Sequence, residues 1–321
     1  MKGGSERSEI VLQIRDLEDK HGVRRKVAFV VNSYAQVRQL MRYLGRRHPQ
    51  IAYRTRGVVR ELEEGERYDQ FVTPAMVESL GDDSQIDCLI FPMLALGRAV
   101  NIVFRHGRHA QKAAIGILYF LTRPHPGLDD LSFFFSVAAC ATQEFDAHSF
   151  LPDTSLQEMH QAWMDKRRET FRYVARLLQE PIQASRLGNK LLPAFTANTM
   201  VQVLQTIGRA MRGGMPVRVF FVDAAWAPNT AEDQPDTERS SMLVMMRTIL
   251  EACLSHPDGP IRELYHELYA AFLEPMRRLN LNTTAMPSLP SADEEPDGVE
   301  PSRTLFEDPD EFMRAVTPEN L

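Results

Sequence analysis

The most constraining feature of the sequence is a set of four uninterrupted apolar runs. They are rich in β-branched and aromatic residues: "KVAFVVN" (26–32), "QIDCLIFP" (85–92), "AAIGILYFLT" (113–122) and "VRVFFVD" (217–223). A strand with one solvated face alternates apolar and polar residues, whereas a strand of a parallel sheet is covered on both faces and stays apolar throughout. The runs therefore predict buried strands of a parallel sheet.

Helical patterns lie between these runs. Ser33 directly follows the first run and can cap a helix. The apolar residues of that helix recur at helical spacing, at Val37, Leu40, Met41 and Leu44. Similar patterns occupy 74–81, 128–143 and 198–212, and "IAYRT" at 51–55 suggests a shorter strand. The alternation predicts an α/β fold with a mostly parallel sheet and helices on both faces.

The length of 321 residues suits one large domain with additions. We expect an N-terminal segment at 1–25, a main lobe at 26–235, C-terminal helices at 236–285 and a disordered acidic tail at 286–321. A helical insertion near 155–180 interrupts the lobe, because Ser155 and Glu158 have the spacing of a capping box. Two helical patterns follow within 242–281, broken at "SHPDGP". The tail carries ten acidic residues against two arginines, a composition typical of disorder.

Composition excludes several classes of protein. No apolar run reaches the ~18 residues of a membrane span, and the N-terminus lacks the apolar core of a secretory signal. We therefore expect a soluble, cytoplasmic protein with no membrane partner. The three cysteines lack C-x-x-C spacing, and His106 and His109 have no evident third ligand, so no metal site is expected.

Basic residues are unevenly distributed along the chain. Residues 24–60 contain ten Lys or Arg and no Asp or Glu, and residues 88–128 and 181–222 each contain five against none. Three acid-free stretches separated by acidic ones predict parts of one basic, phosphate-binding surface. The alternative is that parts of these stretches are buried strands. That alternative explains the missing acids but leaves the added arginines unexplained.

One octad before the last apolar run, "QTIGRAMR" at 205–212, has the spacing Q-x-x-G-R-x-x-R. It resembles motif VI of superfamily 2 helicases, at the helix preceding the last strand of the second RecA-like lobe. Two further segments match in the same order. "VAFVVNSYAQVRQL" (27–40) resembles motif IV, and "DCLIFPMLALGRAVNIV" (87–103) resembles motif V, with Ala99 where the family has glycine. The resemblance covers about residues 26–225 and implies a RecA-like fold.

A narrower resemblance concerns "FPMLALGRAVNIVF" and "AAIGILYFLTRPHPGLDDL". Both are similar to helicase-like proteins of prokaryotic defence islands, including those that accompany the PIWI-like nuclease modules called pPIWI-RE. A helicase motor also needs a first lobe with a G-x-x-x-x-G-K-[ST] phosphate loop and an acidic pair for Mg²⁺. The sequence contains neither. The resemblance therefore implies a second lobe, as a fragment or a split subunit, that shares ATP and Mg²⁺ with a partner lobe.

The resemblance assigns roles to the octad. Arg212 is the better candidate for an arginine finger, with Arg209 beside it to orient the phosphates, because a guanidinium can bond two phosphate oxygens in one plane. Gln205 would bond the attacking water or couple to nucleic acid, and Gly208 would let the helix approach closely. Both arginines are expected on one face of one helix. The alternative is a salt-bridged structural helix end.

Other residues are expected to contact a single strand of DNA or RNA. The candidates are Ser33, Arg38, Arg98, Asn101, Arg105 and Arg108. For Ser33 and Asn101, a plain helix cap and a turn residue are equal alternatives. Two other functions stay open for the chain. One is a non-catalytic nucleic-acid-binding module, and the other is an assembly subunit whose acidic tail and C-terminal helices recruit a nuclease.

Overall fold

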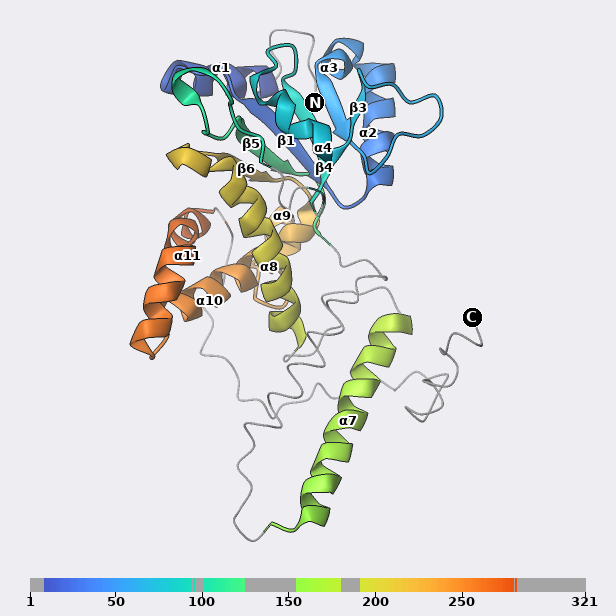
Figure 1. Cartoon of the computed structure of the whole chain (residues 1–321). Coiled ribbons are helices and arrows are strands. Elements are labelled where there is room, and N and C mark those ends of the chain that lie inside the picture. The colour runs from blue at the N-terminus through green and yellow to red at the C-terminus, as the bar shows by residue number, and fades with distance from the viewer. Residues whose placement is uncertain are drawn as a thin grey trace. The chain divides into compact units, whose positions relative to one another are not determined.

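The computed structural model describes residues 9–124 without 94 and 96–100, residues 154–179, and residues 191–281 without 280 (Figure 1). The chain divides into two compact units. The first comprises Met1–His125 with Thr199–Thr284, and the second comprises Pro126–Asn198 with Ala285–Leu321. The helix predicted at 128–143 and the predicted disordered tail lie outside the described residues.

The first unit is built on a six-stranded sheet in which every strand runs parallel to its neighbours. The strand order is β3-β2-β4-β1-β5-β6. The strands are β1 (Lys26–Val31), β2 (Thr55–Val58), β3 (Phe71–Val72), β4 (Cys88–Pro92), β5 (Ile115–Phe120) and β6 (Arg218–Phe221). The four apolar runs form β1, β4, β5 and β6, which confirms that they belong to one parallel sheet. All six residues of β1 are buried, whereas those of the edge strand β6 are half-buried.

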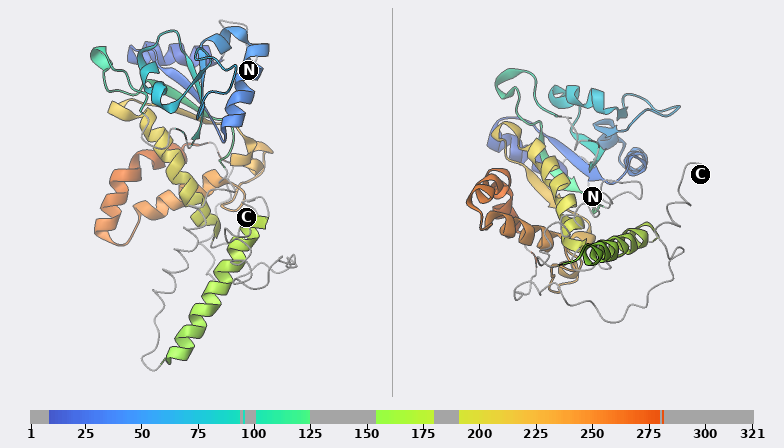
Figure 2. Two further views of the ribbon diagram at one scale, coloured as in Figure 1. Left: turned by 45° about the vertical axis from the view of Figure 1, so that its right-hand side comes forward. Right: turned by 60° about the horizontal axis from the view of Figure 1, so that its bottom comes forward.

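Helices cover both faces of this sheet (Figures 1 and 2). The helices concerned are α1 (Glu9–His21), α2 (Tyr34–Arg47) and α8 (Leu191–Ala210). On one face, Leu17 of α1 and Met41 of α2 join Phe29 of β1 in a single buried core. On the other face, Ala210 of α8 and Leu118 of β5 line the same small pocket. The predicted fold class, a parallel α/β sheet of RecA-like type with helices on both faces, is confirmed.

Two predicted elements have different limits in the structure. The strand predicted at 51–55 is wrong, because the segment forms α3 (Pro49–Tyr53) before β2 begins at Thr55. A proline in the first turn of a helix is favourable, since its missing N–H would have no partner there. The pattern at 74–81 forms α4 (Pro74–Val77) and then the 3₁₀ helix η1 (Glu78–Asp82).

The helix predicted at 198–212 begins and ends earlier, as α8. Two glycines follow its end: Gly213 has a φ of 71° and Gly214 a φ of 72°. This left-handed region favours glycine and commonly terminates a helix. Arg212 therefore starts a separate 3₁₀ turn, η4 (Arg212–Gly214), and does not lie on α8.

The first unit ends with the two helices predicted within 242–281. They are α10 (Met242–Leu254) and α11 (Gly259–Arg277), and they pack against each other (Figure 2). Asp258 caps α11 by accepting a hydrogen bond from the Ile261 N–H over 3.2 Å. Between β6 and α10 lie η5 (Ala224–Trp226) and α9 (Pro228–Ala231).

In the second unit the structure describes α7 (Leu156–Gln179) and residues 191–198 of α8. The Ser155 N–H donates to Glu158 Oε2 over 2.7 Å, and the Glu158 N–H donates to Ser155 Oγ over 3.2 Å. The predicted capping box is therefore confirmed. Among the helices that the structure describes, none combines the length and the apolar composition that a membrane crossing requires.

Candidate functional site

The candidate site centres on Arg209, near the end of α8. Its Nη1 donates a hydrogen bond to Asn101 Oδ1 over 3.1 Å, and both residues are half-buried. Asn101 lies in the loop after β4, and its own N–H donates to Glu78 Oε1 over 3.2 Å. Two side chains 108 positions apart, one from each of two motif-like segments, therefore meet in the fold.

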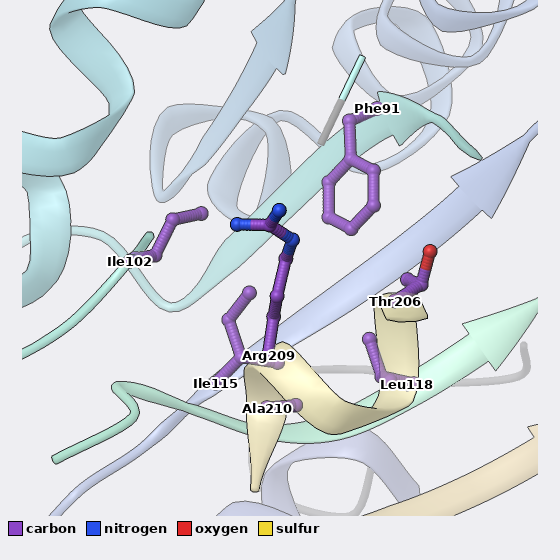
Figure 3. Close-up of a pocket in the computed structure, with 7 residues that line it drawn as sticks. All are labelled: Phe91, Ile102, Ile115, Leu118, Thr206, Arg209 and Ala210. Carbon is purple, nitrogen blue, oxygen red and sulfur yellow. The ribbon is translucent and has the colours of Figure 1, made fainter. Parts of the chain in front are cut away.

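A small, mostly apolar pocket borders the Arg209 side chain (Figure 3). Its lining residues are Phe91, Ile102, Ile115, Leu118, Thr206, Arg209 and Ala210. Figure 3 shows the Arg209 side chain extending from α8 toward Ile102 and Phe91. The apolar walls cover the aliphatic stem, while the guanidinium stays within hydrogen-bonding distance of Asn101. The pocket and the hydrogen bond together restrict the orientation of Arg209.

Arg212 is held quite differently. Its side chain is exposed and forms no hydrogen bond or ion pair within the described part of the chain. Its backbone is engaged, because the Arg212 carbonyl accepts from the Ala113 N–H over 3.0 Å. The prediction that both arginines leave one face of one helix is wrong, since α8 ends at Ala210. Arg212 is nevertheless accessible to an anion from outside the chain.

The two other octad residues lie within α8. Gln205 is exposed and precedes Arg209 by four residues, so the two side chains share one helix face. A Cβ atom added at Gly208 would lie 3.9 Å from Phe272 Cζ, which is ordinary van der Waals contact. Packing within the chain therefore does not require glycine at this position. That Gly208 lets the helix approach closely stays a prediction.

Arg25 fixes the end of α8, although no sequence motif points to it. Only 1% of Arg25 is exposed. Its guanidinium donates to the carbonyls of Ala210 (2.9 Å), Ala113 (3.1 Å), Ile115 and Pro216. Burial lowers the pKa of Arg25 to about 10, so the group is charged at neutral pH. One buried cation thus joins β5, the end of α8 and the segment that leads into β6.

Ser33 and Arg38 lie at the carboxyl edge of the sheet, at the start of α2. Ser33 is exposed and its Oγ accepts from the Gln36 N–H over 3.2 Å, as a helix cap does. Arg38 Nε donates to Glu66 Oε1 over 2.7 Å, and its Nη2 lies 3.2 Å from Glu63 Oε1. The hydrogen bond from Arg38 holds the pKa of Glu66 below its ordinary value. The Arg38 guanidinium is therefore bound by carboxylates of the chain itself.

Arg105 and Arg108 lie in the segment between β4 and β5, at the opposite edge of the sheet from Arg38. Both are exposed, and Arg108 Nη2 donates to the carbonyl of Gly22, which precedes β1. The predicted phosphate contacts thus do not gather on one face. Arg98, also predicted, lies outside the described residues.

Two histidines, His106 and His109, lie in the same segment. His106 Nδ1 lies 3.1 Å from Asp82 Oδ2, and His109 Nε2 accepts from Arg108. No group of three or more His, Cys, Asp or Glu in the described ranges could hold a metal ion. The chemistry that the site offers is therefore that of guanidinium groups and a carboxamide, which bind anions.

Comparisons with known proteins identify no relative of this chain. Protein-family models, curated protein sequences and solved structures all give no significant match. The functional argument therefore depends on the residues and contacts of the chain itself.

Proposed function

We propose that this chain is the second motor lobe of an ATP-dependent helicase or translocase that acts on DNA or RNA. The observation that carries the proposal is the hydrogen bond between Arg209 and Asn101. It joins the segment that resembles motif VI to the segment that resembles motif V, on a parallel sheet of the required type. The similarity to defence-island proteins extends the proposal to bacterial defence.

In this proposal, ATP and Mg²⁺ are bound mainly by another lobe, because the sequence has no phosphate loop. That lobe belongs to another polypeptide or to a further part of the same protein. This chain contributes positive charge to the nucleotide from across an interface. The residues described above fit such a contribution, because one guanidinium is exposed and a second is held in place by a carboxamide.

Each octad side chain has a distinct proposed role. Arg212 acts as the arginine finger, because its exposed guanidinium can reach a nucleotide that another lobe holds. Arg209, oriented by Asn101, positions the phosphates beside it. Gln205 lies on the same face of α8 as Arg209 and bonds the attacking water or the nucleic acid. Phosphoryl transfer spreads negative charge over the γ-phosphate oxygens. These groups therefore stabilise the transition state more than they stabilise bound ATP.

The proposal is tested by reconstitution. The purified chain alone should show no ATPase activity, and addition of a phosphate-loop lobe encoded in the same operon should restore it. In that complex, Arg212→Ala should lower kcat by on the order of a thousandfold with little change in ATP affinity. Arg212→Lys should rescue little, because an ammonium cannot bridge two oxygens in one plane.

Arg60→Ala is the matched control, because Arg60 is an exposed arginine on the loop after β2 and carries no proposed role. It should leave the ATPase rate unchanged. An ATPase rate that is indifferent to Arg212→Ala and Arg209→Ala together would refute the motor-lobe proposal. The arginine pair would then be structural.

A second candidate function is assembly, which a feature of α11 favours. Ile261, Leu264 and Leu268 are 39%, 53% and 51% exposed, and their spacing puts them on one face of the helix. Exposed apolar faces of this kind bind other proteins. In this case the chain recruits a partner such as a nuclease. Replacing Leu264 and Leu268 with glutamate would then abolish the complex and leave nucleic-acid binding intact.

A further inference from the structure

The segment between β4 and β5 folds back on itself as an antiparallel hairpin, residues 102–114. An antiparallel bridge links Val103 to Ala113. The Phe104 N–H donates to the Lys112 carbonyl over 2.9 Å, and the Gln111 N–H donates to the Phe104 carbonyl over 2.7 Å. The tip is the short 3₁₀ helix η2 (Gly107–His109). This hairpin projects a compact set of side chains near the amino edge of the sheet.

Positive charge is concentrated on the hairpin. Between residues 102 and 114 there are two arginines, one lysine and two histidines, and no acidic residue. We call Arg105, Arg108 and Lys112 the hairpin patch. Arg105 and Arg108 are exposed, and Lys112 is half-buried. The patch is therefore a local excess of positive charge that solvent can reach.

Carboxylates of η1 compensate part of this charge. Arg105 Nη2 lies 3.8 Å from Glu78 Oε2, and Asp82 Oδ2 accepts from the Arg105 N–H over 2.9 Å and lies 3.1 Å from His106 Nδ1. Arg108 donates to two neutral acceptors, the Gly22 carbonyl and His109 Nε2. Lys112 Nζ has no hydrogen bond or ion pair with the residues that the structure describes. Arg108 and Lys112 thus meet no carboxylate of the described residues, and such cations on a folded surface favour a bound polyanion.

The patch also adjoins the turn that carries Arg212. The Ala113 N–H donates to the Arg212 carbonyl over 3.0 Å. A Cβ atom added at Gly213 would lie 2.9 Å from Lys112 Cγ, so the lysine stem rests against that glycine. A polyanion bound to the patch would therefore lie beside η4. Glycine at position 213 is required both by its positive φ and by this contact.

We propose that the hairpin patch binds the sugar-phosphate backbone of a single-stranded nucleic acid. Three cations spread along a hairpin match a chain of regularly spaced phosphates. A membrane surface fits less well, because the strongly exposed large apolar side chains of the described ranges include none from the hairpin. This inference deepens the proposed function and rests on it for the choice of polyanion.

The test measures binding by the full chain without ATP. Fluorescence anisotropy is recorded with a labelled single-stranded oligonucleotide of about 20 nucleotides at several salt concentrations. Three phosphate contacts predict a slope of log affinity against log salt of about −2, since each contact on a single strand contributes about −0.7. Arg108→Gln with Lys112→Gln should reduce affinity about tenfold or more and bring the slope to about −0.7.

The matched control is Arg60→Gln with Arg67→Gln, which removes two exposed arginines from the loop after β2. It should retain the affinity and slope of the unmodified chain, and circular dichroism should show that both variants are folded. Equal affinity and slope for the patch variant and the unmodified chain would overturn the inference. Equal loss in the control would also overturn it, as would binding to vesicles of anionic phospholipid as tight as to the oligonucleotide.

The outcome is separable from that of the motor-lobe proposal. Patch-dependent binding by a chain that never activates a phosphate-loop lobe would support this inference and contradict the proposed function. Activation of such a lobe by a chain whose oligonucleotide binding ignores the patch would do the reverse.

Discussion

The loop after β2 and the hairpin after β4 handle positive charge in opposite ways. In the loop, Glu63 and Glu66 form ion pairs with Arg38 of α2, whose side chain is 18% exposed. In the hairpin, Arg108 meets neutral acceptors and Lys112 meets no carboxylate among the described residues. The glutamates of the loop neutralise Arg38 of α2 within the fold, whereas the hairpin leaves Arg108 and Lys112 available to a ligand.

The difference shows what an acid-free stretch of sequence does and does not mean. Residues 24–60 contain ten basic residues and no acidic one, yet Glu63 and Glu66, whose carboxylates bind Arg38, lie just after this stretch. Asp87 likewise reaches Arg24 and Arg54 from a distant part of the chain. Charge counted along the sequence therefore overestimates the basic surface, because acids outside a stretch fold back onto it.

The largest expected effect concerns Arg25, which joins the base of the hairpin to the turn after α8. Arg25→Met would leave four carbonyls without their donor, and the free energy of unfolding should fall by about 4 kcal/mol. Urea unfolding in a Trp163→Phe background measures this, because the remaining tryptophan, Trp226, is 1% exposed in the first unit. Arg24→Met is the control, since Arg24 is 41% exposed and should cost about 1 kcal/mol or less. Equal losses for the two variants would show that the carbonyl contacts of Arg25 do not stabilise the fold.

A smaller effect is expected at Gly81, where η1 supports the hairpin. A Cβ atom at this position would lie 2.0 Å from the Val103 carbonyl oxygen, so the hairpin would have to move. Gly81→Ala should therefore destabilise the first unit by about 3 kcal/mol and weaken oligonucleotide binding. Gly45→Ala on α2, where nothing lies within 4 Å of the added atom, should instead stabilise by about 0.5 to 1 kcal/mol. The same urea assay checks both, and a neutral Gly81→Ala would mean that the hairpin is not locked to η1.

The sheet could be predicted from the sequence because burial on both faces leaves a continuous apolar run. All four such runs became strands of one sheet. The helix α1 was not predicted, although Ile14 and Leu17 have helical spacing and are 2% and 3% exposed. Its pattern is short and rich in charge, so it carries little weight until the partner surface is known. The strands β2 and β3 have only four and two residues, so they leave no long apolar run in the sequence.

The candidate site could be predicted only as far as local spacing reaches. The octad pointed to Arg209, but nothing near it in the sequence identifies Asn101 as its partner, because the contact spans 108 positions. The end of α8 depends on Gly213 and Gly214, whose positive φ values separate Arg212 from the helix. The role of Arg25 could not be predicted from the sequence, because an arginine that binds carbonyls has no acidic partner that would identify it.

The smallest expected effects are opposite pH dependences at two charged groups, Lys26 of β1 and Glu66 of the loop after β2. Lys26 is 5% exposed, and its Nζ donates to the carbonyls of Asp83 (2.7 Å) and Ile86 (2.8 Å). Burial lowers its pKa to about 8, so above this pH the unfolded chain binds more protons than the folded one. Stability should therefore rise by about 2 kcal/mol between about pH 8 and about pH 10, and Lys26→Met should remove this rise.

Glu66 is the counterpart, because Arg38 lowers its pKa. Its contribution to stability is therefore present above the ordinary carboxyl pKa and is lost as the pH falls through the folded value. Glu66→Gln should flatten the acid limb alone, and a variant that altered the other limb would show that these two groups do not cause the pH dependence.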